Sequence, residues 1–240
     1  MKNFFTVLGG MGTLATESFV HVLNKRTPIQ RDQDYLNYLL VNHATVPDRT
    51  KFILGQSDES PLEVLQEDLV QYSALKPDFF VLTCNTAHHF YDELSQTTEI
   101  PILHMPRLAV TAVQKNYAEL NQAIRVGVLA TTGTIQSKIY RNELNRYENI
   151  EVVEPDELLQ EKVMTLIYRD IKENNFLNEA LFDEILEKML NEFNCDVILL
   201  GCTELSLIQE ETHHSQYPVI DAQSELVNET IRLALANRKK

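Results

Sequence analysis

The sequence has 240 residues, of which 44% are hydrophobic and 23% are charged, as in an ordinary soluble globular protein of one large or two small domains. Its 35 acidic and 21 basic residues give a formal net charge of −14. This charge argues against nucleic acid or an anionic membrane surface as a partner, because both bind basic faces, and no segment approaches the ~18 consecutive apolar residues of a membrane-spanning helix.

Short apolar runs alternate with amphipathic segments along nearly the whole chain. The expected strands, in chain order, are Phe4–Leu8, Tyr35–Val41, Phe79–Thr83, Ile102–His104, Arg125–Ala130, Val197–Leu200 and Val219–Ile220. Several are apolar at consecutive positions, which is typical of parallel strands covered by helices on both faces of a sheet. The first run predicts a strand and not a secretion signal, and the whole pattern predicts the α/β class.

Helical patterns fill the segments between the expected strands. One begins at Ser60, where Pro61 and Glu63 predict a capping box with proline at the first helical position. Residues 156–172 and 177–193 carry similar apolar stripes. His21 lies on an apolar face of an earlier helical segment and is expected to be packed.

A weak internal repeat divides the chain into two halves. The stretch VLGGMGTLAT at 7–16 resembles VLATTGTIQS at 128–137, and each is followed by a later strand that ends in cysteine and threonine or asparagine. Gly12 precedes Cys84 by 72 residues, and Gly133 precedes Cys202 by 69. Two matches in the same order at similar spacing predict duplicated halves.

Two domains follow from this repeat. We expect the first to comprise residues 1–105 plus 212–240 and the second to comprise residues 106–211. The last helical segment is assigned to the first domain, because the second half is complete by about residue 211 and the helix is expected to pack back.

Cysteine usage indicates chemistry at the ends of two strands. Three cysteines are too few for a disulfide framework in a chain of this length, so we expect a reduced, cytoplasmic protein. Ligands bind beyond the carboxyl ends of parallel strands, where Cys84, Cys202 and the turns at 9–13 and 131–134 are expected to lie. If the halves face each other, one thiol can remove a proton from a carbon while the other delivers one to the opposite face. Helix starts after both cysteines would stabilise a thiolate.

Polar and charged residues near these segments are candidates for binding a small acid. Short polar side chains would hold a carboxylate, an acid would orient an ammonium group, and two cations would meet carboxylates. In that order, the candidates are Asn85, Thr86 and Thr203, then Glu204, then Arg49 and Lys162. Each cation is by itself more often a solvated surface charge, Lys162 especially.

Structural roles compete with these assignments. A lone buried cysteine is more often a core residue than a nucleophile, and Cys195 is expected to be one. For Cys84 and Cys202, spacing alone favours a catalytic role and a core role about equally. A Cys84–histidine hydrolase pair would leave the matching Cys202 unexplained. His43 and His104 end strands, where lining a pocket and a structural role are equally expected.

Neither a metal nor a nucleotide cofactor is expected. Cys84 and His88 have i, i+4 spacing, with His89 adjacent and His213–His214 distant, but no C-x₂-C pair of a zinc site exists. The segment Gly10–Ala15 fits G-x-G-x-x-A after a strand, but the acid that normally ends the second strand of a dinucleotide fold is missing. We therefore expect the glycines to bring backbone N–H groups close to a small anion.

With both cysteine segments identified, the chain resembles the aspartate/glutamate racemase superfamily and, within it, the aspartate racemase family. The matching motifs, in family order, are GGMGTLAT, VPDRT, LTCNTAHHFYDEL, HMP, GVLATTGT and LLGCTEL. Glutamate racemases of the cell-wall pathway are similar in plan but open around D-S-G and carry G-C-T-H at the second cysteine. Gly10-Met11-Gly12 and Cys202-Thr203-Glu204 favour the aspartate racemase branch.

This resemblance implies a cofactor-independent, two-base racemase for aspartate first and glutamate second. It implies two similar, doubly wound domains with mostly parallel sheets, related by a pseudo-twofold duplication, with the active site in the cleft between them. Cys84 and Cys202 would be the acid/base pair, and Arg49 and Lys162 would meet the side-chain carboxylate. The residues around the α-carboxylate and amine would be Met11, Gly12, Asn85, Thr86, Thr131, Thr132 and Thr203.

Other interpretations stay open beside the racemase. Many family members are homodimers, which makes a homodimer one expected state. An amino-acid-binding or sensor protein would use the same cleft without turnover. A thiol-dependent isomerase, decarboxylase or hydrolase is a third alternative, although such relatives typically alter one cysteine motif and this chain keeps both.

Overall fold

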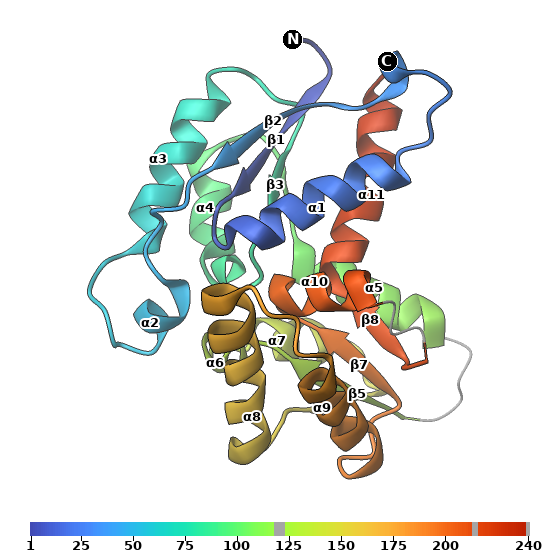
Figure 1. The fold of residues 1–240 in the computed structure, drawn as a ribbon. Coiled ribbons are helices and arrows are strands. Elements are labelled where there is room, and N and C mark those ends of the chain that lie inside the picture. The colour runs from blue at the N-terminus through green and yellow to red at the C-terminus, as the bar shows by residue number, and fades with distance from the viewer. Residues whose placement is uncertain (118–122, 213–215, 239–240) are drawn as a thin grey trace. The chain divides into compact units, whose positions relative to one another are not determined.

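The computed structural model describes residues 1–117, 123–212 and 216–238, and these contain two parallel sheets of four strands each (Figure 1). The first sheet has the order β2–β1–β3–β4. Its strands are β1 (Phe4–Gly9), β2 (Asn37–Asn42), β3 (Phe80–Leu82) and β4 (Ile102–Leu103). β1 pairs with β2 from Phe4 opposite Asn37 to Gly9 opposite Asn42, and every residue of β1 is buried.

Helices cover both faces of this sheet, which explains why β1 is apolar at nearly every position. On one face lie α1 (Thr13–Arg26) and α11 (Ala222–Arg238), and on the other lie α3 (Pro61–Ser73) and α4 (Tyr91–Thr97) (Figure 1). The shorter helices of this part are η1 (Asp32–Asp34), α2 (Arg49–Ile53) and the 3₁₀-helix η2 (Thr86–Phe90).

The second sheet repeats the same plan, with the order β6–β5–β7–β8. Its strands are β5 (Ile124–Leu129), β6 (Ile150–Val153), β7 (Val197–Leu200) and β8 (Val219–Asp221). The helices of this half are α5 (Met105–Tyr117), α6 (Thr132–Gln136), α7 (Ile139–Leu144), α8 (Glu157–Met164), the π-helix η3 (Thr165–Glu173), α9 (Glu179–Asn191) and α10 (Thr203–Thr212). The predicted α/β class with two duplicated, doubly wound parallel sheets is confirmed.

The chain divides into a first unit, Met1–Met105 with Gln223–Lys240, and a second unit, Pro106–Ala222. The expected domain boundary differs at 212 and at 216–222: these residues belong to the second unit, where Thr212 ends α10 and β8 pairs with β7. The helix after the last strand of each half lies in the other unit. Thus Arg107 of α5 binds Glu143 of α7 at 3.1 Å, and Arg26 of α1 donates to Ser224 of α11 at 2.5 Å.

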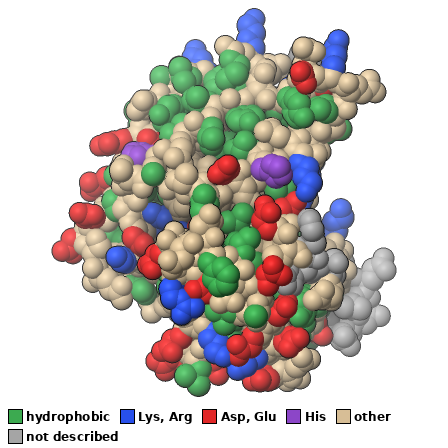
Figure 2. Space-filling view, viewed as in Figure 1, with side chains coloured by type: hydrophobic (Ala, Val, Ile, Leu, Met, Phe, Trp, Pro, Cys, Tyr) green, Lys and Arg blue, Asp and Glu red, His purple; other side chains and the backbone are tan. Residues whose placement is uncertain are grey.

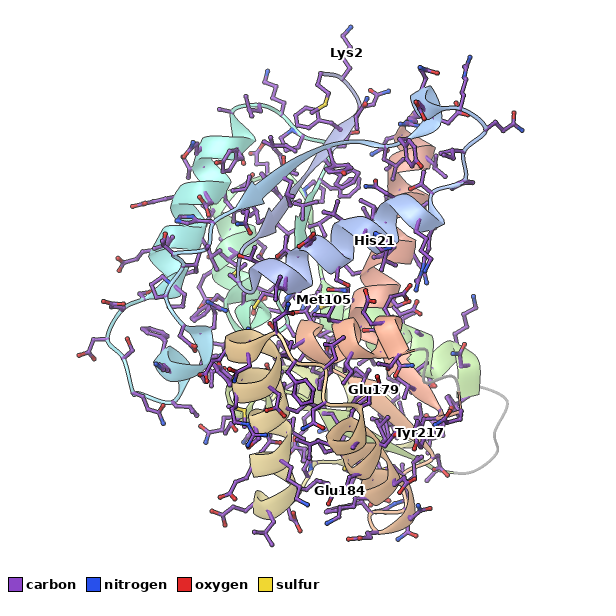
Figure 3. All side chains as sticks on the ribbon, in the orientation of Figure 1. Lys2, His21, Met105, Glu179, Glu184 and Tyr217 are labelled. Atoms are coloured by element: carbon purple, nitrogen blue, oxygen red, sulfur yellow. The ribbon has the colours of Figure 1, made fainter. Side chains whose placement is uncertain are left out.

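Several local expectations are wrong. β6 is a strand that the sequence did not predict, and residues 156–172 form α8 followed by a π-helix instead of one α-helix. Ser60 is the N-cap of α3, but its side chain makes no capping hydrogen bond. His21, labelled in Figure 3, is exposed on α1 because the apolar stripe of that helix does not extend to it.

The turn between β1 and α1 depends on Gly10. Its φ is +90°, and a Cβ there would lie 2.5 Å from the carbonyl carbon of His43. The Gly10 N–H donates to Thr16 Oγ1 at 3.0 Å, and that hydroxyl donates to the Gly12 carbonyl at 2.8 Å. The turn that carries Met11 and Gly12 is therefore held by its own backbone and by the first helix.

A buried histidine joins the ends of β3 and β4. His88 Nδ1 lies 2.8 Å from the Cys84 carbonyl oxygen, and the Met105 N–H donates to His88 Nε2 at 3.1 Å. A neutral ring protonated at Nδ1 satisfies both contacts, since it donates to one backbone group and accepts from the other. Burial lowers the pKa of His88, although hydrogen bonds to the Cys84 and Leu103 carbonyls oppose this effect. The backbone of Cys84 is thereby tied to the start of α5.

We expect Gly10→Ala to lower the free energy of unfolding by about 3 kcal/mol or more, because it combines left-handed strain with a backbone clash. Gly55→Ala is the matched control: Gly55 has a φ of +68°, but a Cβ added there would have nothing within 4 Å. It should cost only about 1 kcal/mol, from strain alone. Urea unfolding of the full chain measures both, and equal losses would show that the clash with His43 is absent.

His88→Phe should lower the free energy of unfolding at neutral pH by about 2–4 kcal/mol, because it leaves a buried carbonyl and a buried N–H without their ring partners. His89→Phe is the control, since the neighbouring His89 is exposed and should change stability by only about 0.5 kcal/mol.

The stability difference between the parent and His88→Phe should also depend on pH. The folded pKa of His88 lies below the ordinary value of 6.5, so the unfolded chain binds the proton first as pH falls. The contribution of His88 is therefore complete above pH 6.5 and is lost as pH falls towards the lowered folded pKa. Urea titrations at several pH values should show the difference narrowing in acid; a difference that widens would contradict a neutral ring.

Candidate functional site

Cys84 lies two residues beyond the end of β3 in the first unit and is only 5% exposed. Asn85 and Thr86 follow it and are also buried. The helix that starts there, as expected, is the five-residue 3₁₀-helix η2, with Asn85 as its N-cap. The structure therefore brings three of the predicted site residues together at the carboxyl edge of the first sheet.

The hydrolase alternative finds no support in the geometry around Cys84. His88 directs Nδ1 to the Cys84 carbonyl and Nε2 to the Met105 N–H, so both ring nitrogens meet backbone groups. His104 packs edge-on against the His88 ring, with the centroids 5.4 Å apart. These histidines act as packing and tethering groups beside the cysteine.

Cys202 lies two residues beyond the end of β7 in the second unit, the position that Cys84 has in the first. Its Sγ donates to Glu204 Oε2 at 3.0 Å, and Lys172 Nζ donates to Glu204 Oε1 at 2.5 Å. Cys202 and Glu204 are buried, whereas the Lys172 side chain is 23% exposed. Thr203 is buried beside them at the start of α10. Glu204, expected to orient an ammonium group, thus contacts the thiol and a lysine.

Lys172 is the charged residue of this cluster that the sequence did not indicate. It lies 30 residues before Cys202 on the π-helix η3, and no motif or spacing connects the two. A lysine near the end of an apolar stripe is ordinarily a solvated charge, so its place in the sequence did not indicate a role beside Cys202.

The protonation of this cluster follows from its charges. Burial raises the pKa of Cys202 well above its usual value, the Glu204 carboxylate raises it further, and Lys172 opposes both. For Glu204, burial acts to raise the pKa, but Lys172 and the hydrogen bond from Cys202 outweigh it and the net pKa is lowered. The pair therefore consists of a thiol that donates to a carboxylate.

Arg49 lies beside the turn that carries Met11 and Gly12. Its Nη2 donates to the Met11 carbonyl at 2.7 Å, and its Nη1 donates to the carbonyls of Val46 at 3.1 Å and Pro47 at 3.0 Å. A guanidinium has five N–H groups, and three of them here bind main chain. Arg49 is thus joined to Met11 through contacts that also fasten two loops.

Thr131 and Thr132 lie at the end of β5, where α6 begins. Thr131 is the N-cap of α6, and its Oγ1 accepts the Thr134 N–H at 3.2 Å. The Thr132 N–H contacts the Met164 sulfur at 3.2 Å. A pocket of about 460 Å³ opens here within the second unit and is lined by Thr132, Glu157, Gln160, Glu161, Met164 and Thr165. This pocket has room for a small metabolite.

Lys162 lies on α8 and pairs with Glu184 of α9. Figure 3 labels Glu184, which also lies 3.7 Å from Lys188. The Lys162 side chain is 38% exposed, so this is a surface ion pair of modest strength. The sequence did not predict that Lys162 pairs with a carboxylate of the same chain.

Cys195 is a core residue, as expected. It is buried among the apolar side chains between α9 and the second sheet, and a Cβ on Gly127 would lie 2.9 Å from its sulfur. Burial is the main cause that raises its pKa to about 11. The thiol is therefore neutral and inert at ordinary pH.

Within the described ranges, no group of three or more His, Cys, Asp and Glu side chains is arranged to hold a metal ion. His213 and His214, weighed as distant ligands, lie outside these ranges. On the face drawn in Figure 2, Lys and Arg side chains are dispersed among acidic ones. Over the same described residues, every helix is too short or too polar to cross a membrane.

Three comparisons relate the chain to known proteins. The model of the Asp/Glu/hydantoin racemase family matches residues 8–230. The broad specificity amino-acid racemase RacX of Bacillus subtilis is 29% identical over 237 residues, 96% of this chain and 97% of the relative. A glutamate racemase of Fusobacterium nucleatum is 28% identical over 179 residues, 68% of this chain and 64% of the relative.

A solved structure agrees with these sequence matches. The aspartate racemase of Picrophilus torridus superposes with a TM-score of 0.80 at 30% identity, covering 96% of this chain and 94% of that one. The family match spans both cysteine segments and nearly the whole chain. The resemblance stated from the motifs is confirmed, and the chain belongs to the Asp/Glu/hydantoin racemase family.

Proposed function

We propose that the protein is a cofactor-independent amino-acid racemase in which Cys84 and Cys202 form the acid/base pair. We take aspartate as the first candidate substrate and glutamate as the second. The supporting relatives are an aspartate racemase, a broad specificity amino-acid racemase and glutamate racemases. The family membership and the paired thiols support racemisation over binding without turnover.

One observation carries the proposal: the two cysteines occupy equivalent positions in the two duplicated units. β3 pairs with β1 up to Leu82 opposite Leu8, and β7 pairs with β5 up to Leu200 opposite Leu129. Each cysteine follows two residues later, buried, with polar neighbours. A duplicated thiol is what a reaction on two faces of one carbon requires.

The reaction uses the two thiols in opposite protonation states. The thiolate on one side takes the α-proton, and the electron pair of the broken C–H bond stays on the α-carbon and delocalises into the carboxylate. The thiol on the other side gives its proton to the opposite face and becomes the thiolate. The reverse direction starts from that form, so protons and charge balance over each turnover. The carbanion is stabilised by hydrogen-bond donors and cations around the carboxylates.

The polar residues near each thiol are proposed to hold the substrate. We assign the α-carboxylate and amine to Met11, Gly12, Asn85, Thr86, Thr131, Thr132 and Thr203. Arg49, already beside Met11, is proposed to meet the side-chain carboxylate. Lys162 and Glu204 have protein partners, Glu184 for the lysine and Cys202 with Lys172 for the acid, so we no longer assign them to the substrate. A homodimer and a cytoplasmic location stay predictions.

The proposal predicts that Cys84→Ala and Cys202→Ala each lower racemisation by at least about 10²-fold, the scale of one positioned acid or base. Cys195→Ala, a core cysteine, should keep the activity. Purified proteins would be incubated with single enantiomers of aspartate, glutamate and other amino acids without added cofactor, followed by chiral chromatography. In deuterated water, each single-site variant should retain α-proton exchange for one enantiomer only.

Two results would overturn the proposal. A Cys84→Ala protein that racemises at the parent rate would remove the acid/base pair. A parent protein that binds amino acids in calorimetry but changes none of their configurations would be a binding protein.

A further inference from the structure

The surroundings of the two thiols are not equivalent, although their positions are. Cys202 donates to Glu204 at 3.0 Å, and Glu204 receives Lys172 at 2.5 Å, so three elements meet: the turn after β7, α10 and η3. In the first unit the residue two after Cys84 is Thr86, which carries no charge. At this position, a carboxylate follows the second cysteine and a threonine hydroxyl follows the first.

The π-helix η3 holds the lysine in place. Its residues Leu166, Ile167 and Ile171 are buried in the core of the second unit, which anchors the helix. Lys172 Nζ lies 5.6 Å from the centre of the Tyr168 ring on the same helix, in addition to its contact with Glu204. π-Helical segments are rare in proteins, and those that occur are frequently found at functional sites. Lys172 is thus oriented towards Glu204 by packing and by two contacts.

Other titratable groups near Cys202 come from the elements packed around it. Tyr140 of α7 packs on Gly201, where a Cβ would lie 2.7 Å from its ring. Burial and then the charge of Asp221 raise the pKa of Tyr140, so it is neutral. Asp221 of β8 accepts the Ser206 hydroxyl at 2.5 Å. Its negative charge has the same sign as that of Glu204. Among these described groups, Lys172 supplies the positive charge.

We propose that Glu204, kept ionised by Lys172, is a positioning residue that holds the proton on Cys202, so that the resting protein presents a thiol on this side. The catalytic meaning rests on the proposed racemase function: Cys202 then acts first as the acid, and the first base is Cys84. A carboxylate at hydrogen-bond distance favours the thiol over the thiolate in two ways: it repels the negative charge of the thiolate, and it accepts a hydrogen bond from the S–H group.

In an active racemase this asymmetry has a defined kinetic form. Because the equilibrium constant between enantiomers is unity, kcat/KM is the same for both at every pH. A Glu204 variant must therefore change kcat/KM equally for the two enantiomers, and loss of the asymmetry appears as a change in the ratio of their kcat values that an equal change in the ratio of their KM values accompanies. A structural lesion would lower kcat of both enantiomers by a similar factor and leave these two ratios unchanged.

The direct test is a titration of the Cys202 thiol without substrate. The full chain would be labelled with carbon-13 at cysteine Cβ, and its three cysteine signals would be assigned through single Cys→Ser variants and followed against pH by NMR. Glu204→Gln keeps an acceptor for the S–H but removes the charge, and we expect it to lower the Cys202 midpoint by about one pH unit or more. Glu211→Gln, which removes an exposed charge on the same helix, should leave it unchanged.

A second variant covers the case in which Glu204→Gln does not fold. The double variant Glu204→Gln with Lys172→Met removes both partners and leaves no unpaired buried charge. Its Cys202 midpoint should lie below that of the parent, because the effect of Glu204 that is lost is larger than the opposing effect of Lys172.

The outcomes separate this inference from the proposed function. A Glu204→Gln protein that folds, by circular dichroism, with an unchanged or higher Cys202 midpoint overturns the inference even if the parent racemises amino acids. If the Cys202 midpoint is lowered in Glu204→Gln and the parent racemises nothing, the proton-holding role of Glu204 is upheld and racemisation is rejected.

Discussion

Parallel pairing of strands that are buried on both faces is the constraint on which the rest of this structure depends. A strand covered on both sides by helices must be apolar at most positions, as β1 and β5 are, and its neighbours must be reached by crossover helices. All carboxyl ends then meet at one edge of each sheet. Polar residues that follow the strands are thereby collected at that edge. One thiol in each sheet follows an inner strand, β3 or β7.

Duplication explains where the thiols are, and the flanking elements explain how they differ. Cys84 is tied through its carbonyl to a neutral, buried His88, whereas Cys202 is bound through its sulfur to an ionised Glu204. The first arrangement orders the backbone, and the second places a carboxylate against the thiol. Two copies of one plan thus differ in the groups that contact their cysteines, and the proposed acid and base roles would use this difference.

Three cations discussed above each bind groups of the protein itself. Arg49 binds three main-chain carbonyls, Lys162 binds Glu184, and Lys172 binds Glu204. In a chain with a net charge of −14, any cation at the site works against the general field, so a fixed geometry matters more than the number of cations. Holding Arg49 by the backbone beside Met11 is one way to obtain such a geometry.

Sequence by itself determined the fold class, the duplicated plan and the positions of both thiols, because apolar periodicity and turn residues act between neighbours in the chain. It missed β6, where Glu151 interrupts a short strand that pairs on one side only, and it gave no sign of the π-helix. Tertiary structure alone decided that Lys172 meets Glu204, that Glu204 meets Cys202, and that β8 joins the second sheet. These contacts join residues of different elements through packing, and the free energy of an ion pair depends on burial and distance, which no local pattern encodes.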